Sequence, residues 1–282
     1  MRKLKFTLNR VSLNQIYISY VRPLLEYSSI VWAGCTEQQI TSLERMQNEA
    51  ARIVTGLTRS VSLENLYNEC GWESLRSRRD FQKCIFMYRA YNNFVPQYIV
   101  DLFPLNVHER TGYNIRNPEN FTVPFCRTEI MRKSCVPSAI ELWNKLDYET
   151  KTASSMSIFK GRVRSPRPAI TSLYYLQGKR TLTVLHCRIR NNCSNLNVDL
   201  FNNHLSISPY CLNCNSFEDA EHYFFKCQLY QNQRQALFNE TRDLHPLGTH
   251  ILLFGNDTLS LEDNKRLFES VLKYIKDTKR FT

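Results

Sequence analysis

The stretch Cys211–Cys227, CLNCNSFEDAEHYFFKC, decides how the last third of this 282-residue chain folds. Two cysteines two residues apart form a knuckle that presents both sulfurs to one ion, and a following His-x4-Cys can complete a tetrahedral set. Three thiolates and one imidazole favour zinc, and four protein ligands leave no open position for water. We therefore predict one structural zinc ion held by Cys211, Cys214, His222 and Cys227.

These residues have two other interpretations. In the first, Cys211 and Cys214 are incidental and His222 is a surface residue beside Glu221; the complete four-residue pattern argues against this. In the second, the zinc is catalytic, as in nucleobase deaminases, which need a His-x-Glu or Cys-x-Glu ahead of Pro-Cys-x-x-Cys. No such glutamate precedes Cys211, so a deaminase is rejected.

The chain contains ten cysteines, most of them scattered singly. An even number could form disulfides, but the length and the lack of a secretory signal favour reduced thiols in an intracellular protein, cytoplasmic or nuclear. No run of about 18 apolar residues is present, so we expect no membrane span.

Positive charge is concentrated in residues 150–198, where no Asp or Glu occurs, and the whole chain carries 37 Lys and Arg against 26 Asp and Glu. Such a stripe could be a solvated basic face, balanced by acidic neighbours in three dimensions. We favour a binding surface for a polyanion, because a basic stripe gains affinity by releasing counterions from phosphates. The predicted nucleic-acid contacts are Lys160, Arg162, Arg164, Arg167, Lys179, Arg180, Arg188 and Arg190.

The apolar spacing predicts a mainly α-helical chain. Thr36 and Gln39 form a capping box ahead of a helix that ends near Gly56. Pro23 is expected to kink or interrupt a helical stretch over 13–33. The other helices are expected near 62–71, 74–93, 137–146, 182–192, 229–241 and 260–278.

In the helix over 74–93, one face is apolar, and the outward face is expected to hold basic residues that include Arg79 and Lys83. Gly, Asn and Pro residues break up the segment near 110–131, where short strands over Phe121–Phe125 and Thr128–Met131 would make a β-hairpin.

Two prolines in Ser165–Pro168 favour an extended spacer. The sequence therefore predicts a helical region over 1–164, a basic linker over 165–181, and a small zinc-stapled helical domain over 182–282. No nucleophile elbow, Walker loop, His-Glu-x-x-His or Asp-Asp pair is present, so we expect no catalysis by this chain alone.

Several motifs, taken in order, resemble the C-terminal part of reverse transcriptases of non-LTR retrotransposons, the jockey-like elements among them. They are YISYVRPLLEY at 17–27, VW at 31–32, LERMQ at 43–47, AAR at 50–52, TVP at 122–124, RT at 127–128, KS at 133–134, LWNKL at 142–146, RIR at 188–190 and the Cys/His cluster. The resemblance implies that the chain begins where the polymerase thumb begins, so the helical region 1–164 would be thumb-like. It also implies zinc ligation by Cys211, Cys214, His222 and Cys227.

The resemblance carries over no catalytic residue, because the aromatic-x-Asp-Asp motif of the palm has no counterpart here. Two functions follow as expectations. The first is a non-catalytic, RNA- or DNA-binding part of a reverse transcriptase, with the missing palm and fingers as a possible partner. The second is a zinc-stabilised helical module that binds an acidic protein or a membrane surface through a solvated basic face.

Overall fold

The computed structural model describes residues 1–32, 34–112, 118–164, 178–244 and 246–281. Within these ranges the chain is mainly helical, with 62% helix and no β-sheet, which confirms the expected class. None of the helices in the described ranges is both long and apolar enough to cross a membrane.

The helices group into two compact units, neither of which is one continuous stretch of sequence. Unit 1 consists of Met1–Ile18, Asn48–Gly71 and Ala169–Thr282, and unit 2 of Ser19–Gln47 and Trp72–Pro168. The long helix α3 (Glu37–Thr55) contributes its first part to unit 2 and its second part to unit 1. The division at 164 and the linker over 165–181 stay predictions, and most of that linker lies outside the described residues.

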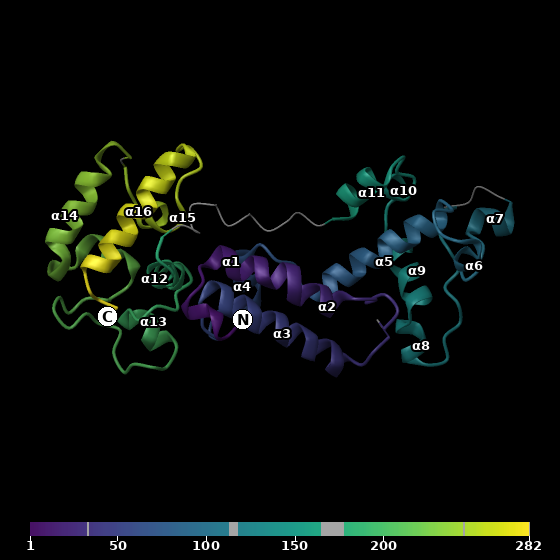
Figure 1. Ribbon diagram of the computed structural model, residues 1–282, viewed down its shortest axis with the longest axis horizontal. Coiled ribbons are helices and arrows are strands. Elements are labelled where there is room, and N and C mark those ends of the chain that lie inside the picture. The colour runs from purple at the N-terminus through teal and green to yellow at the C-terminus, as the bar shows by residue number, and fades with distance from the viewer. Residues whose placement is uncertain (33, 113–117, 165–177, 245, 282) are drawn as a thin grey trace. The chain divides into compact units, whose positions relative to one another are not determined.

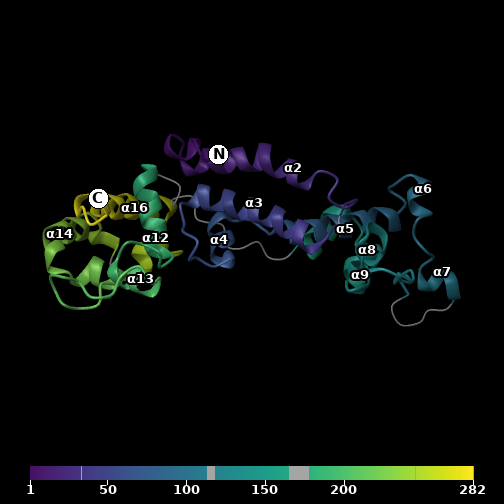
Figure 2. The ribbon, with the colours of Figure 1, turned by 90° about the horizontal axis from the view of Figure 1, so that it is seen from below.

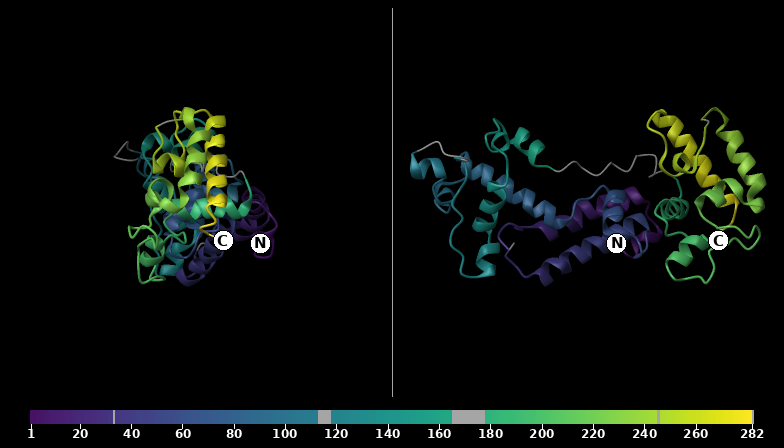
Figure 3. Two further views of the ribbon diagram at one scale, coloured as in Figure 1. Left: turned by 90° about the vertical axis from the view of Figure 1, so that its left-hand side faces the viewer. Right: turned by 180° about the vertical axis from the view of Figure 1, so that it is seen from behind.

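Unit 1 holds the short N-terminal helices and all of the helices after residue 178. Besides its part of α3, unit 1 contains η1 (Leu4–Phe6), α1 (Arg10–Ile16), α4 (Leu63–Cys70), α12 (Arg180–Arg190), α13 (Asn197–Asn202), η4 (His222–Lys226), η5 (Gln228–Tyr230), α14 (Gln231–Glu240), η6 (Arg242–Leu244), α15 (Thr249–Phe254) and α16 (Leu261–Asp277). Helix α16 lies beside α14, and also contacts α12 and α15 (Figures 1 and 3).

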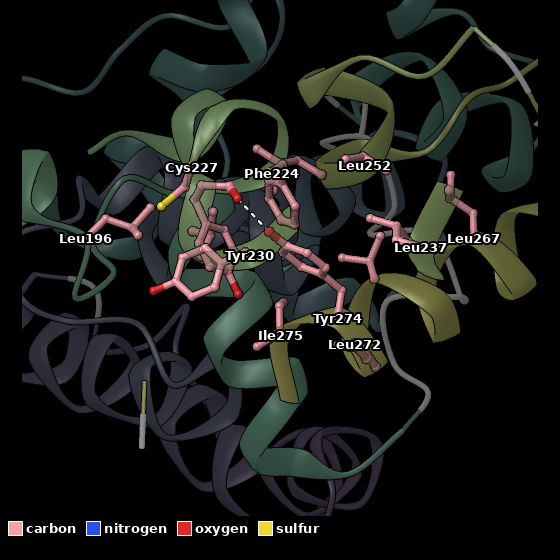
Figure 4. Close-up of a cluster of buried hydrophobic side chains, with 14 of the residues drawn as sticks. Leu196, Phe224, Cys227, Tyr230, Leu237, Leu252, Leu267, Leu272, Tyr274 and Ile275 are labelled. Atoms are coloured by element: carbon pink, nitrogen blue, oxygen red, sulfur yellow. Dashed lines mark hydrogen bonds between the residues drawn. The ribbon is translucent and has the colours of Figure 1, made fainter. Parts of the chain in front are cut away.

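The core of unit 1 lies along α16, whose Leu267 and Val271 are completely buried. Figure 4 shows that Tyr274 of α16 points toward the segment that carries Phe224 and Cys227. The Tyr274 hydroxyl donates a hydrogen bond to the Tyr223 carbonyl at 2.6 Å. The apolar face of α16 therefore holds the Cys/His segment in place.

Unit 2 is built around α5 (Leu75–Tyr91), which packs against α9 (Cys135–Asn144) (Figure 2). Trp143 of α9 is fully buried, and its indole N–H donates to the Glu119 carbonyl at 2.9 Å. The remaining elements are α2 (Arg22–Glu26), α6 (Gln97–Val100), α7 (Val107–Thr111), α8 (Glu129–Lys133), α10 (Tyr148–Lys151) and α11 (Met156–Val163), with the π-helical turn η2 (Tyr17–Val21) at the boundary between the units.

Helix ends follow the expected local chemistry. The Thr36 hydroxyl accepts from the Gln39 N–H at 3.4 Å, and the Gln39 side chain accepts from the Thr36 N–H at 3.0 Å, which confirms the capping box. Ser74 caps α5 by accepting from the Ser77 N–H at 3.1 Å. Pro23 lies in the first turn of α2, directly after η2, so the helical stretch is interrupted there.

Three expectations for residues 74–131 are not met. The expected strand over Thr128–Met131 is instead the start of α8, because Thr128 caps a helix by accepting from the Met131 N–H at 3.2 Å. Within the described part of this segment, Phe121 forms only an isolated bridge with Asn106, so a hairpin is not seen there. Arg79 and Lys83, expected on the outward face of α5, are 4% and 7% exposed.

Candidate metal centre and the basic residues

The first two candidate ligands lie in a tight turn that is closed by its own backbone. Tyr210 and Phe217 form an isolated antiparallel bridge across it, and the Cys211 N–H donates to the Ser216 carbonyl at 2.8 Å. Asn215 occupies the left-handed region, at φ +51°, which short Asn side chains tolerate. This geometry turns the chain back on itself between Cys211 and Ser216.

The other two candidate ligands are placed by the π-helical turn η4. Its first residue is His222, whose N–H donates to the Asp219 carboxylate at 2.7 Å. Cys227 directly follows the turn, and its N–H donates to the His222 carbonyl at 2.8 Å. The turn therefore places His222 and Cys227 close to each other.

The four side chains converge on one place. Their ligand atoms all lie within 4.8 Å of one another. The Cys227 sulfur is 4.0 Å from that of Cys211 and 3.9 Å from that of Cys214. Two sulfurs bound to one tetrahedral zinc at about 2.3 Å would be separated by roughly 3.8 Å. Cys211, Cys214, His222 and Cys227 thus form a possible metal-binding site.

The orientation of the histidine agrees with metal ligation. Nδ1 of His222 lies 3.1 Å from the Ser216 hydroxyl, so one ring nitrogen has a hydrogen-bond partner. The other, Nε2, is buried and has no hydrogen-bond partner among the described residues. A buried polar atom without a partner is costly, and a metal ion would accept its lone pair. The donor set therefore fits a tetrahedral cation.

The Cys214 thiol is also prepared for ligation by its neighbours. The backbone N–H of Gln228 and the side-chain amide of Asn213 each lie 3.5 Å from its sulfur. These two hydrogen bonds lower the pKa of Cys214, the one from Gln228 most. Both stabilise the thiolate form of the side chain, which is the form that binds metals.

A buried ion pair fastens the turn to the end of the chain. Glu218, 4% exposed, accepts two hydrogen bonds from Arg280, at 2.7 and 2.8 Å. The second carboxylate oxygen also accepts from the Asn197 N–H at 3.0 Å. Since paired oxygens and a fork of donors fix geometry, this contact holds the metal segment against the start of α13. No feature of the sequence pattern singled out Glu218 or Ser216.

Several exposed apolar side chains lie close in sequence to the candidate ligands. The rings of Tyr210 and Phe217 pack at 4.9 Å, and both are partly or largely exposed, at 43% and 57%. Leu212, between the two knuckle cysteines, is 98% exposed, and Ile207 is 99% exposed. The sequence pattern did not indicate these exposed side chains, because apolar residues in a loop carry no periodic signal.

The eight basic residues proposed to contact nucleic acid are divided between the two units. Lys160, Arg162 and Arg164 lie at the end of α11 in unit 2 and are exposed. The Arg162 guanidinium donates to the Glu149 carbonyl, and Arg164 lies 3.9 Å from Glu73. Arg167 lies outside the described residues.

In unit 1, Lys179 is exposed, but two arginines of α12 are used to cap the C-terminal end of α3. Arg180 donates to the carbonyls of Ile53 and Val54 at 2.5 and 3.1 Å, and Arg188 donates to the Gly56 carbonyl at 2.9 Å. The last carbonyls of a helix lack intrahelical partners and attract positive charge. Arg180 and Arg188 therefore stabilise the fold.

Arg190 is not a surface residue, and its burial argues against the predicted nucleic-acid contact. It is 7% exposed, and its guanidinium lies 2.6 Å from the carboxylate of Glu69, which is itself 8% exposed. Arg10 approaches the same carboxylate at 2.7 Å. A buried arginine between protein partners cannot reach a phosphate backbone, and Glu69 supplies from α4 the negative charge missing from 150–198.

The described residues therefore define a helical protein with a possible metal centre of three thiols and one imidazole. Comparisons with protein-family models, with curated proteins and with solved structures found no match to this chain.

Proposed function

We propose that this chain is a zinc-stabilised, non-catalytic nucleic-acid-binding module of the kind found at the C-terminal end of non-LTR retrotransposon reverse transcriptases. The observation that carries the zinc part is the convergence of three sulfurs and a histidine nitrogen within 4.8 Å. A structural zinc would stabilise the turn at 211–216 against η4. The order of the sequence motifs supports the reverse transcriptase part, and the missing palm and fingers would then be its partner.

Exposed basic and aromatic groups support the nucleic-acid part of the proposal. Lys160, Arg162 and Lys179 are exposed, and such side chains bind phosphates without sequence preference. The Tyr210 and Phe217 rings offer a surface on which unpaired bases can stack. RNA or single-stranded DNA is therefore the ligand class that fits both features.

The second candidate is a protein-interaction module, and one observation favours it. Leu205, Ile207 and Leu212, near the metal centre, are each at least 75% exposed. Exposed apolar groups gathered in one segment can mark a protein-binding site. The internal use of Arg180, Arg188 and Arg190 also leaves fewer charges for phosphate than the sequence alone indicates.

The two candidates are separated by binding measurements on the full zinc-loaded chain. We expect single-stranded RNA to bind and poly-glutamate not to bind at the same charge concentration. About three contacts, from Lys160, Arg162 and Arg164 of unit 2, would give a log–log salt slope near −2. The double variant Lys160→Ala/Arg162→Ala should flatten the slope by about 1.4.

The matched control is Lys3→Ala/Arg59→Ala, which removes the same charge from exposed positions outside 150–198 and should change the slope less. Equal binding of poly-glutamate would contradict nucleic-acid binding and favour the protein-interaction module. An equal loss in both double variants would contradict the placement of the contacts at Lys160 and Arg162.

Zinc is tested separately. Purified chain should contain one zinc per molecule, and Cys214→Ser should lose it, because a three-ligand site binds far more weakly. Cys126→Ser, at a half-buried cysteine outside the cluster, should keep the zinc. Full zinc content in the Cys214 variant would overturn the assignment.

A further inference from the structure

Arg79 of α5 is buried without adequate partners. It is 4% exposed, and both of its terminal nitrogens, Nη1 and Nη2, lack a hydrogen-bond partner among the described residues. The nearest carboxylate is that of Glu44, 3.7 Å from Nη2, and Glu44 already accepts from the N–H groups of Leu75 and Arg76. The face of the Trp32 ring lies 5.5 Å from the guanidinium carbon. A buried guanidinium whose donors are unpaired costs free energy unless another group accepts hydrogen bonds from it.

Arg79 lines a cavity of about 300 Å³ within unit 2, between α3, α5, α8 and α9. Five basic side chains contribute to its wall, namely Arg76, Arg79, Lys83, Lys133 and Lys145. Three acidic side chains also line it, namely Glu37, Asp80 and Glu141. The wall thus carries two more positive than negative charges.

The acidic groups in the wall are engaged with basic ones. Glu37 pairs with Arg76 and, at 3.3 Å, with Lys133. Glu141 pairs with Arg132, which lies outside the wall, at 3.0 Å. The Asp80 carboxylate is 3.8 Å from Lys83, at the edge of a salt bridge. None of the three acidic side chains of the wall is therefore a hydrogen-bond partner of Arg79, whose terminal nitrogens are buried without an acceptor among the described residues.

The chemistry of the wall selects the class of ligand. A guanidinium offers a planar fork of donors that matches two oxygens of a phosphate, and lysines add compact positive charge. Ser138 adds a hydroxyl to the same wall. A tetrahedral oxyanion would satisfy Nη1 and Nη2 and neutralise the excess charge in one step.

We propose that this cavity binds a phosphate group, with the guanidinium of Arg79 as its central donor. The group could be free inorganic phosphate or part of a polynucleotide backbone, which share the same chemistry. The site goes beyond the proposed function, since it requires neither the zinc centre nor the basic residues of 150–198.

The proposal is tested by titrating the full zinc-loaded chain with inorganic phosphate at constant ionic strength, with chloride as the reference salt, followed by calorimetry and by the melting temperature. Phosphate should bind and raise the melting temperature, and Arg79→Gln should weaken binding at least tenfold. Lys145→Ala, at an exposed wall position, should weaken it several-fold without affecting the fold. Arg89→Ala, exposed on the same helix but outside the wall, should bind as the parent chain does.

Should Arg79→Gln not fold, Lys145→Ala and Lys83→Met decide the question in its place. A phosphate effect no larger than that of chloride, or unchanged affinity in these variants, would overturn the site.

A second arm titrates single-stranded oligonucleotide in competition with phosphate. If the wall variants lose the binding of both phosphate and oligonucleotide, the phosphate group that the site binds belongs to a polynucleotide backbone. If they lose phosphate binding alone, the site binds free phosphate. Failure of oligonucleotide binding in the parent chain, with phosphate still bound, would count against the proposed function and not against this site.

Discussion

The Ser216 hydroxyl lies 3.1 Å from Nδ1 of His222, on the opposite side of the imidazole from Nε2. When Nδ1 donates its proton to Ser216, Nε2 carries the lone pair that a metal ion needs. The contact therefore fixes the orientation of the ring, and metal binding at Nε2 requires the tautomer in which Nδ1 carries the proton. Ser216 belongs to the knuckle turn and His222 to η4, so this hydrogen bond also joins the two halves of the candidate metal centre.

Ser216→Ala should weaken zinc affinity by about tenfold while leaving one zinc bound at saturation, because outer-shell partners typically contribute 10–100-fold. Competition with a chromophoric chelator measures the change. Ser157→Ala, at an exposed serine of α11, is the control and should leave the affinity unchanged. An affinity equal to that of the parent chain in Ser216→Ala would mean that the hydroxyl does not orient the ring.

Glu69→Gln should destabilise unit 1 by about 3–5 kcal/mol, because it leaves the guanidinium groups of Arg10 and Arg190 buried without a counter-charge. Urea unfolding measures this difference. Glu64→Gln changes an exposed residue of the same helix and should alter the free energy of unfolding by less than about 0.5 kcal/mol.

The same carboxylate predicts a pH dependence. Burial raises the pKa of Glu69, but the charges of Arg190 and Arg10 outweigh it and lower the value from 4.5 to about 2. A carboxyl whose pKa is lower in the folded state contributes stability above its unfolded pKa and loses it as the pH falls. The parent chain should therefore lose about 3 kcal/mol between pH 4.5 and 2 from this group. Glu69→Gln should show a shallower acid dependence over that window, and an identical pH profile would contradict the assignment.

Gly56→Ala should cost about 2–4 kcal/mol, since Gly56 has φ +78° and an added Cβ would lie 2.6 Å from two methyl carbons of Val184. Gly71→Ala is the matched case: its φ is +66°, but no atom lies within 4 Å of the added Cβ. It should cost only about 1 kcal/mol, from backbone strain. Thermal unfolding of the two variants measures the difference, and equal costs would show that Val184 moves aside freely.

The isolated chain should extend no primer in the presence of Mg²⁺ and nucleoside triphosphates. Phosphoryl transfer requires two metal ions held by paired carboxylates, and the sequence contains no adjacent aspartates. The measurement is primer extension on an RNA template, with an intact polymerase as the positive control. Extension by this chain would refute the non-catalytic assignment.

Local sequence determined where most helices begin and which residues form the candidate metal centre. Thr36 and Ser74 cap α3 and α5 through contacts three residues away, so short-range spacing was enough to find them. Cys211, Cys214, His222 and Cys227 lie within 17 residues, and their chemistry and spacing predict convergence without knowledge of the fold. The strand expected at 128–131 was wrong, because the cap formed by Thr128 outweighed the extended signal of the surrounding turns.

Only the tertiary structure decided what the basic residues do. The sequence places Arg180, Arg188 and Arg190 in an uninterrupted positive segment, but their partners, the end of α3 and the carboxylate of Glu69, are more than 120 residues away along the chain. Arg79 likewise has the sequence position of a surface residue and is buried. Charge counted along a sequence includes only near neighbours, whereas the energy of a buried charge depends on every group that packing brings within a few ångströms of it.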